Sequence, residues 1–286
     1  MLGKENFKNG SIEGFNRNWN KRNESHYIHW TRTSPDNQIR LAFYNHFKLF
    51  RDLEKKSKEI NKKFIEIGAG RGSLSAYYAQ NNYDVTLLDT SEEIINIAKK
   101  IFELNKLKAN FIVSNAEDTG IKSDTYDIVA SIGLLEHFSD PNKIFKESIR
   151  IAKSNADIYF YVVPEKEIFI QKIFDKINNI LAIINNEQKR TKKDEIFRST
   201  YDINFYKNIL KKYYSISNIN SFGVYPLPMI SPNRDFPFTL NNKILEILIT
   251  RIFSIVLNLR FIFLRRNPWI CREKNGQAFL LHFRKK

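Results

Sequence analysis

Three glycines at alternate positions form the part of this sequence whose residue types point most directly to chemistry. A short apolar run, 64–67, stops at Gly68, Gly70 and Gly72, and a helical pattern begins at Ser73. This order predicts a buried strand, a tight turn and a helix. Glycine adopts φ values closed to other residues, and because it has no Cβ it lets a ligand approach the backbone closely. The spacing therefore predicts a turn that holds a bound molecule.

Two acidic residues stand beside this turn. Glu66 lies inside the first predicted strand, and Asp89 follows the second, 84–88. A carboxylate offers only hydrogen-bond acceptors. Two common nucleotide motifs do not fit, because the third position of Gly-x-Gly-x-x-Gly falls on Ser73 and the Gly-Lys-Ser/Thr that ends a P-loop is missing. A dinucleotide and a P-loop nucleotide are therefore excluded.

Apolar strands and amphipathic helices alternate along most of the chain and would position these residues. Strands are expected at 64–67, 84–88, 110–113, 126–131, 157–163, 215–222 and 277–283, and helices at 38–58, 74–80, 94–102, 167–184 and 202–213. This order predicts an α/β protein with a doubly wound, mostly parallel sheet of seven strands and helical insertions. Thr90 is the expected N-cap of the helix after the second strand, with Glu93 completing a capping box. Pro141 is expected at the first position of the helix after the fourth strand.

The composition limits the partners and the cellular setting. The net charge of +15 indicates an acidic partner, either nucleic acid or an anionic membrane, but the lysines are scattered among Glu and Asp, which favours a generally charged surface. Cys271 is the only cysteine, so a disulfide framework and a Cys-rich zinc site are excluded and no metal is expected. The first residues lack the apolar core of a signal peptide, so a cytoplasmic location is expected.

The glycine turn, with Glu66 in its strand and Asp89 at the end of the next strand, resembles the S-adenosylmethionine site of class I methyltransferases, which have a Rossmann-like fold. The resemblance runs roughly from Arg40 to Pro164. It implies that the turn lies under the methionine and ribose parts of the ligand, and that Asp89 accepts hydrogen bonds from both ribose hydroxyls. It also implies that residues 115–117 flank the adenine. They read Asn-Ala-Glu, where the family commonly has Asp-Ala and an acidic residue.

The stretch after the fourth strand narrows the resemblance. Leu135, Glu136 and His137 precede Asp140 and Pro141, and this looks like the Leu-Glu-His-x-x-Asp-Pro stretch of the ubiquinone-biosynthesis O-methyltransferases and their small-molecule relatives. His137 is the candidate general base, because a neutral imidazole titrates near working pH and the residue follows the fourth strand, at the edge where ligands bind. The alternative is a histidine that caps or packs the next helix. Glu136 is expected to orient the loop.

The region before the first strand supplies further candidates. Trp30 and the segment 37–41 are similar to the part of that group whose arginine meets the ligand's carboxylate, which implies this role for Arg40, with a solvated helix arginine as the alternative. His29 and His46 are weaker candidate bases. The residues implied to contact S-adenosylmethionine are Arg40, Glu66, Gly68, Ala69, Gly70, Gly72, Asp89, Thr90, Asn115, Ala116, Glu117, Ser131 and Ile132.

One domain with insertions is expected from the length of 286 residues and the 42% hydrophobic content. Its parts would be a polar N-terminal segment with an aromatic lid at 1–36, an S-adenosylmethionine-binding core at 37–164, and the remainder of the sheet at 165–286. That last part would carry helical insertions on the substrate side, at 165–200 and 226–270.

The expected reaction is transfer of a methyl group from S-adenosylmethionine to a hydroxyl oxygen of a small-molecule or lipid-linked acceptor, such as an envelope glycan. One alternative is a nucleic-acid (RNA) methyltransferase. Nucleic-acid methyltransferases that methylate amino groups have Asn or Asp, two prolines and an aromatic residue where this chain has 131–134. Those that methylate cytosine at C5 need a cysteine nucleophile, and Cys271 lies in the wrong place for it. A nucleic-acid partner is therefore disfavoured. The other alternative is a non-catalytic cofactor-binding protein at a membrane surface, because Asn115 departs from the family pattern.

The segment 240–264 is strongly apolar, but charged residues interrupt it, so it is not expected to span a membrane. These charged residues are Lys243, Glu246, Arg251 and Arg260. Extended to 240–266, the segment is suited to lying in the plane of an anionic bilayer, which would place the protein at the inner face of the membrane. A helical cover over the sheet or a dimer face is the alternative, and the oligomeric state is left open.

Overall fold

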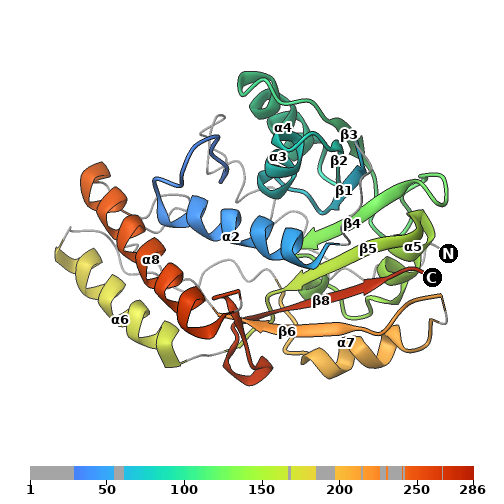
Figure 1. Cartoon of the computed structure of the whole chain (residues 1–286). Helices are drawn as coiled ribbons and strands as arrows, with labels where there is room; N and C mark the ends of the chain where they lie inside the picture. The colour runs from blue at the N-terminus through green and yellow to red at the C-terminus, as the bar shows by residue number, and fades with distance from the viewer. Residues whose placement is uncertain are drawn as a thin grey trace.

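The computed structural model shows a mixed α/β protein built on one central sheet (Figure 1). The structure describes residues 29–54, 61–166, 169–184, 197–213, 215–225, 230, 240, 242–265 and 267–286. Most of the expected polar N-terminal segment, including the first residues of the expected aromatic lid, lies outside the described residues, as does most of the connection at 226–241.

The sheet has eight strands in the order β3-β2-β1-β4-β5-β8-β6-β7. The strands are β1 (Lys63–Ile67), β2 (Asp84–Asp89), β3 (Asn110–Val113), β4 (Tyr126–Ile132), β5 (Ala152–Val162), β6 (Asn220–Val224), β7 (Ile270–Cys271) and β8 (Ala278–Arg284). The pairs among β1 to β5 are parallel, and the pairs of β8 with β5, β8 with β6, and β6 with β7 are antiparallel. The predicted doubly wound, mostly parallel sheet is confirmed. The prediction of seven strands was short by one, because β7 has only two residues and leaves no pattern in the sequence.

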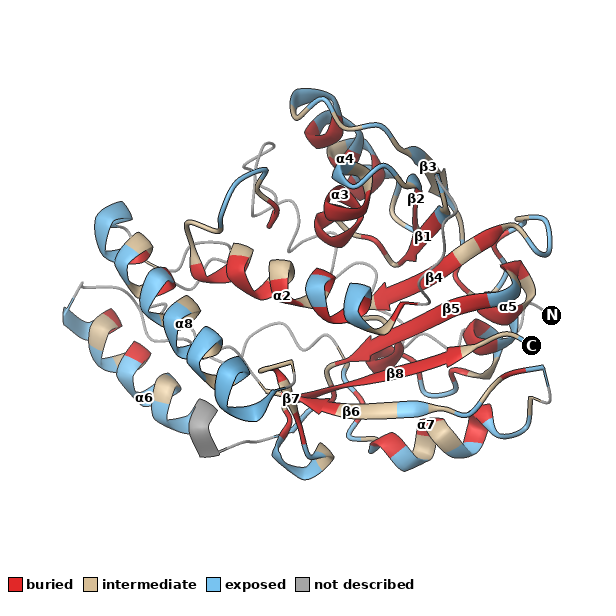
Figure 2. Ribbon diagram, in the orientation of Figure 1, coloured by how far each residue is buried: buried red, intermediate tan, exposed pale blue. Residues whose placement is uncertain are grey.

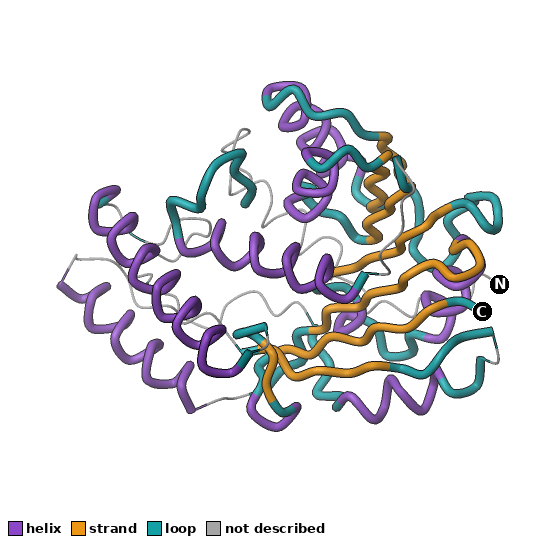
Figure 3. The backbone as a smooth tube through the Cα atoms, viewed as in Figure 1, coloured by secondary structure: helices purple, strands orange, loops and turns teal. Residues whose placement is uncertain are grey.

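The helices lie on both sides of this sheet (Figure 3). They are α2 (Gln38–Leu53), α3 (Ser73–Gln80), α4 (Glu92–Leu104), α5 (Asn142–Ile151), α6 (Phe169–Ile184), α7 (Ile203–Leu210) and α8 (Lys243–Leu264), with short 3₁₀ turns η1 (Leu135–His137) and η2 (Glu273–Asn275). At two helix starts the observed N-cap residue differs from the prediction by one position. Ser91, and not Thr90, caps α4, where its Oγ accepts from the Ile94 N–H at 3.3 Å. Pro141 occupies the N-cap position of α5 rather than its first turn.

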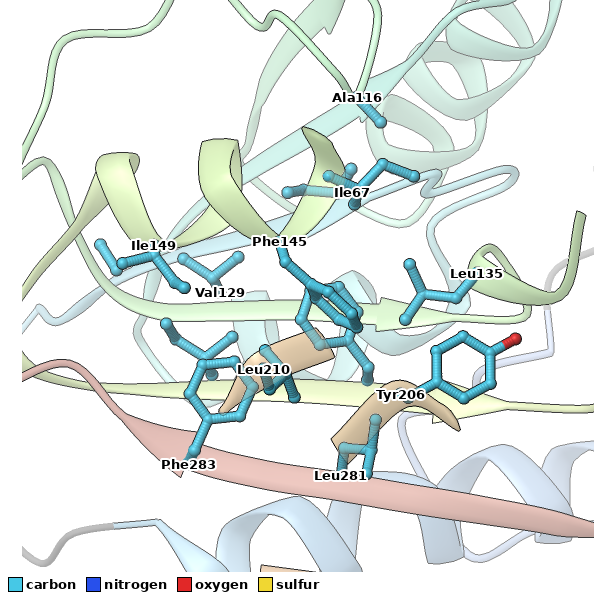
Figure 4. Packing of buried hydrophobic residues seen from close by; sticks show 14 of the residues in the cluster. Ile67, Ala116, Val129, Leu135, Phe145, Ile149, Tyr206, Leu210, Leu281 and Phe283 are labelled. Carbon is cyan, nitrogen blue, oxygen red and sulfur yellow. The ribbon is translucent and has the colours of Figure 1, made fainter. Parts of the chain in front are cut away.

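The two faces of the sheet carry separate apolar clusters, because alternate residues of a strand point to opposite sides. Phe64 of β1 stacks on Tyr78 of α3, with ring centroids 3.9 Å apart. On the other face, Phe145 of α5 and Tyr206 of α7 pack in the cluster drawn in Figure 4. Most of the central strands are therefore buried on both faces (Figure 2), as the continuous apolar runs in the sequence predicted.

The order of the strands indicates at which edge of the sheet a ligand binds. The chain continues from β1 to β2 and β3 on one side, and then crosses to β4 on the other side of β1. Such a reversal opens a crevice at the carboxyl ends of the central strands, where open α/β sheets bind ligands. Gly68 directly follows β1, Asp89 ends β2, and Ser131 and Ile132 end β4. The fold therefore brings these predicted site residues to one edge.

Helix α8 differs from its sequence-based expectation. It has 22 residues and is long and apolar enough to cross a membrane by length and composition. Lys243 and Glu246 both stand in its first turn, so the remainder carries only Arg251 and Arg260 as charged residues. The charges therefore interrupt the helix less than their number in the sequence indicated. Length and composition do not decide between a spanning helix and one that lies on a surface.

Candidate functional site

The glycine turn adopts a backbone that needs glycine. Gly68, Gly70 and Gly72 have φ values of +67°, +53° and +73°, in the left-handed region that other residues rarely adopt. A Cβ on Gly72 would lie 2.3 Å from Leu87 Cδ2, so this position excludes a side chain by packing as well as by φ. The buried Ala69 donates its N–H to the Leu88 carbonyl at 3.0 Å, which fixes the turn against β2.

Asp89 joins the end of β2 to this turn. Its Oδ2 accepts a hydrogen bond from the Gly70 N–H at 3.0 Å, and its Oδ1 accepts one from the Ser91 N–H at 3.1 Å. Burial raises the pKa of the Asp89 carboxyl, although these N–H donors lower it. Each carboxylate oxygen has a second lone pair, so the half-buried side chain can accept further bonds from a ligand.

Glu66 ties the turn to the helix that follows it. Its Oε2 accepts from the backbone N–H of Ser75 at 2.9 Å and from the Ser75 hydroxyl at 2.5 Å. Ser75 lies in the first turn of α3, where backbone N–H groups lack intrahelical partners and favour a negative charge. Burial nevertheless raises the pKa of Glu66 to about 7. The structure thus gives Glu66 a positioning role, and its predicted contact with the ligand stays a prediction.

The loop after β3 lies beside Asp89, because the Ser114 N–H donates to the Asp89 carbonyl at 3.0 Å. Within this loop, Asn115 Oδ1 accepts from the Glu117 N–H at 2.9 Å, and Ala116 is buried. Asn115 itself is exposed, as is Thr90 after β2. The loop is therefore near enough to Asp89 to flank a nucleoside whose ribose meets that carboxylate. Its contact with adenine stays a prediction.

The end of β4 contributes a buried hydroxyl to the same edge. The Oγ atom of Ser131 has no hydrogen-bond partner among the residues that the structure describes, although the side chain is almost fully buried. An unmade hydrogen bond in such a place costs about 1–3 kcal/mol. Ser131 and Ile132 are adjacent to the crevice beside β1. The hydroxyl is therefore available to a ligand there.

Arg40 makes a local ion pair in the structure. It lies in the first turn of α2, and its Nη1 contacts the two carboxylate oxygens of Asp36 at 2.8 and 3.0 Å. Its carbonyl lies 3.5 Å from the Tyr77 hydroxyl of α3, which follows the glycine turn. The side chain is thus held near the turn by Asp36. Its predicted contact with a ligand carboxylate stays a prediction.

Glu136 and His137 lie in the buried turn η1 after β4. His137 Nδ1 lies 2.6 Å from the Phe197 carbonyl, and because a carbonyl only accepts, Nδ1 carries the proton. Burial lowers the pKa of His137 to about 4, against the raising effect of the Phe197 and Gly133 carbonyls, so the ring is neutral. Its Nε2 is 4.0 Å from Glu136 Oε1. His137 therefore holds the segment at 197 while remaining a weak base.

Glu136 has the more suitable proton affinity of the two. Only 1% of it is exposed, and this burial raises its pKa to about 7, while the charge of Arg198 and backbone N–H groups lower it. Its Oε2 has no hydrogen-bond partner within the described part of the chain. A carboxylate that exchanges a proton near neutral pH is suited to general base catalysis. The sequence expectation assigned Glu136 only an orienting role, because its burial cannot be read from the neighbouring residues.

Two further histidines meet above β5. The His29 ring stacks on Phe43 at 5.0 Å, Phe43 meets His46 at 5.4 Å, and His46 meets Tyr161 at 4.4 Å. The backbone N–H of His29 donates a hydrogen bond to the hydroxyl of Ser73, which follows the glycine turn. Burial lowers the pKa of His46 to about 4 and keeps it neutral. A role of His29 or His46 as a base stays a prediction, and Tyr161, inside an apolar strand, gave no signal in the sequence.

Within the described ranges, no group of three or more His, Cys, Asp or Glu side chains is arranged to hold a metal ion.

Comparison with known proteins assigns a family to the central part of the chain. Residues 65–160 match the protein family described as methyltransferase domain. The chain is 29% identical over 102 residues to a ubiquinone biosynthesis O-methyltransferase of Coxiella burnetii, which covers 36% of this chain and 44% of that protein. It is 30% identical over 125 residues to the protein of the same name from Hydrogenovibrio crunogenus, covering 43% and 48%. The match thus spans less than half the length of either relative.

A solved structure extends the comparison to the whole fold. The Thermotoga maritima SAM-dependent methyltransferase, named as a possible histamine N-methyltransferase, superposes with a TM-score of 0.55 at 14% identity, over 96% of this chain and 99% of that one. At this identity the likeness establishes the shared fold.

Proposed function

We propose that this chain, whose residues 65–160 form a methyltransferase domain, transfers a methyl group from S-adenosylmethionine to a hydroxyl oxygen of a small-molecule or lipid-linked acceptor. The observation that carries the proposal is the hydrogen bond between Gly70 and Asp89. It sets a carboxylate with remaining acceptor capacity against a turn that ligands can approach closely. When bound, S-adenosylmethionine would supply a methyl group already activated by a positively charged sulfur.

The residues at this edge fit that cofactor. Asp89 offers acceptors for two ribose hydroxyls, and the left-handed glycines form the tight turn beside this carboxylate. The Ser131 hydroxyl, which has no hydrogen-bond partner in the described part of the chain, supplies a further polar group at the end of β4. The loop at 115–117 follows Ser114, whose N–H donates to the Asp89 carbonyl, and would flank the adenine.

The acceptor side requires a group that removes a proton from the hydroxyl. We assign this role to Glu136, whose pKa of about 7 lets the carboxylate form near neutral pH and then take up a proton. His137 would act as a neutral positioning residue through its bond to the Phe197 carbonyl, although it was the base expected from the sequence. The name of the two curated relatives, O-methyltransferase, supports oxygen as the acceptor atom.

Calorimetry with S-adenosylhomocysteine tests the first step. The wild-type chain is expected to bind it, and Asp89→Ala is expected to bind about 10- to 100-fold more weakly, because hydrogen bonds to a charged group are worth about 1.5–3 kcal/mol. Glu103→Ala, which removes an exposed carboxylate from α4, is the control and should bind as the wild type does. Equal binding by Asp89→Ala, or no binding by the wild type, would refute the proposal.

Transfer of an isotopically labelled methyl group to extracts of candidate acceptors tests the second step. Binding of S-adenosylhomocysteine without transfer to any acceptor class would favour the alternative of a non-catalytic cofactor-binding protein. Transfer to RNA in preference to small molecules and lipids would favour the nucleic-acid alternative, which only the charge of +15 supports.

A further inference from the structure

Helix α8 buries two polar residues against the protein. Its buried residues are Glu246 and Thr250. The Glu246 carboxylate accepts from the Gln38 backbone N–H at 2.8 Å and from the Gln38 side-chain Nε2 at 3.1 Å, which joins α8 to the start of α2. A helix on the surface of a protein in water ordinarily buries its apolar stripe and exposes its polar one. In α8 the two buried positions are polar, Phe253 and Leu257 on the same side are only partly buried, and many large apolar residues are exposed.

Large apolar side chains are exposed at both ends of α8 and between them. Phe263 is 82% exposed and Ile244 is 80% exposed, at opposite ends of the helix. The exposed large apolar residues of α8 are Ile244, Leu245, Leu248, Ile252, Ile255, Val256, Leu259, Phe261, Ile262, Phe263 and Leu264. Leaving such a side chain in water forgoes about 1.5–3 kcal/mol compared with burying it. A contiguous apolar surface of this kind marks a site of interaction.

Helix α6 also exposes a row of large apolar residues. Ile173, Ile177, Ile180 and Ile184 follow one another at steps of four, three and four residues, so they form one stripe, and all of them are exposed. Among the side chains of α6 that the structure describes, the buried ones are Asn178 and Ala182. Both helices extend from the sheet on the same side of the molecule, and their outward surfaces are largely exposed (Figures 1 and 2).

The charges on α8 indicate what covers this surface. Lys243, Arg251 and Arg265 are exposed at its start, within it and at its end. Glu246 is the acidic residue of α8, and it is buried against Gln38. A basic helix with an apolar outer side suits an anionic bilayer, whose headgroups pair with Lys and Arg while the acyl chains receive the apolar side chains. A second copy of a chain that carries +15 would instead bring like charges together.

We infer that α6 and α8 together form a docking surface that inserts into one leaflet of an anionic bilayer. The helices lie in the plane of the membrane and do not cross it, because a crossing α8 would have to give up the hydrogen bonds between Glu246 and Gln38. The surface is larger than the segment 240–266 that the sequence pointed to, since it includes α6.

The docking places the bilayer beside the candidate site. Helix α2, which contacts α8 through Gln38, also carries Arg40 and His46 next to the glycine turn and Tyr161. An acceptor dissolved in the leaflet therefore reaches the site without crossing water. This route for the acceptor rests on the proposed function, and among its two acceptor classes it favours the lipid-linked one. The docking itself does not depend on methyl transfer.

Vesicle flotation of the full chain tests the docking. The probes are vesicles of neutral phosphatidylcholine and vesicles in which about a third of the lipid is anionic phosphatidylglycerol. The wild type should float with the anionic vesicles. A variant with Leu248→Ser, Ile255→Ser and Phe263→Ser should lose at least tenfold in partitioning, and Lys243→Gln should lose about fivefold on anionic vesicles only. Leu104→Ser, which removes an exposed leucine at the end of α4, is the matched control and should float as the wild type does.

The remaining outcomes decide against the inference. No flotation of the wild type, or an equal loss by Leu104→Ser, would overturn it. A dimer in light scattering that the triple variant dissociates would assign the surface to a second copy. Resistance of the bound protein to alkaline carbonate extraction would overturn the in-plane arrangement. Calorimetry with S-adenosylhomocysteine on each variant separates the membrane docking from the proposed methyl transfer. A variant that binds S-adenosylhomocysteine as the wild type does but no longer floats has lost the docking alone.

Discussion

Replacing Glu136 by glutamine should make the protein more stable at neutral pH and less active. Glu136 has a pKa of about 7 in the folded chain and 4.5 as the ordinary value of an exposed glutamate. Between these values the folded state binds more protons than the unfolded state, so the contribution of Glu136 to stability is fully present below pH 4.5 and is lost as the pH rises through 7. A difference of about 2.5 pKa units corresponds to about 3 kcal/mol.

Urea unfolding of wild type and Glu136→Gln between pH 4.5 and 8 measures this contribution. The difference in free energy of unfolding should shift in favour of the variant by about 3 kcal/mol across that range, since glutamine does not titrate. Glu66, whose pKa is likewise raised to about 7, is retained in both proteins, so the difference isolates Glu136. A difference that does not change with pH would refute a raised pKa at Glu136.

The same variant tests the catalytic role. With a hydroxyl acceptor, kcat/KM of the wild type should rise with pH and level off above about pH 7, and Glu136→Gln should be slower by about 10²- to 10⁴-fold without that rise. Binding of S-adenosylhomocysteine should be unchanged. If Glu136→Gln keeps the pH dependence of kcat/KM seen in the wild type, another group removes the proton.

Two further substitutions test the turn and the histidine. In thermal unfolding, Gly72→Ala should destabilise the chain by about 1–3 kcal/mol more than Gly120→Ala. Both positions have positive φ, but an added Cβ meets Leu87 at Gly72 and nothing within 4 Å at Gly120. Equal losses of stability would mean that packing is not involved. His137→Ala should cost about 1–3 kcal/mol of stability by leaving the Phe197 carbonyl without its donor, while the pH dependence of kcat/KM keeps its midpoint; loss of that pH dependence would restore His137 as the base.

The sequence predicted the sheet well where local chemistry specifies the element. β3 begins and ends at the predicted residues, and Asp89 ends β2 as expected. The cap of α4 was missed by one residue because Thr90 and Ser91 carry equivalent hydroxyls, and the choice depends on Asp89 accepting from the Ser91 N–H. β7 was missed because two residues that pair with β6 have no periodicity.

The candidate site was predictable on its cofactor side and much less so on its acceptor side. A turn of glycines and a following acidic residue are read from spacing alone, and the structure joins Gly70 to Asp89. The acceptor side depends on burial, which decides that Glu136 has the raised pKa and His137 the lowered one. Burial arises from segments distant in sequence, such as the one at Phe197, and cannot be inferred from neighbouring residues.

The hydrogen bonds between Gln38 and Glu246 also set the rotational register of α8. Successive residues of an α-helix are about 100° apart around its axis, so inserting or deleting one residue directly after Glu246 would turn the rest of the helix by that angle relative to the carboxylate. The outward direction of the apolar side chains is therefore fixed by a polar contact near one end, together with the packing of the partly buried Leu257 farther along the helix. Variation in length is thus expected to be tolerated before Asn242 and excluded directly after Glu246.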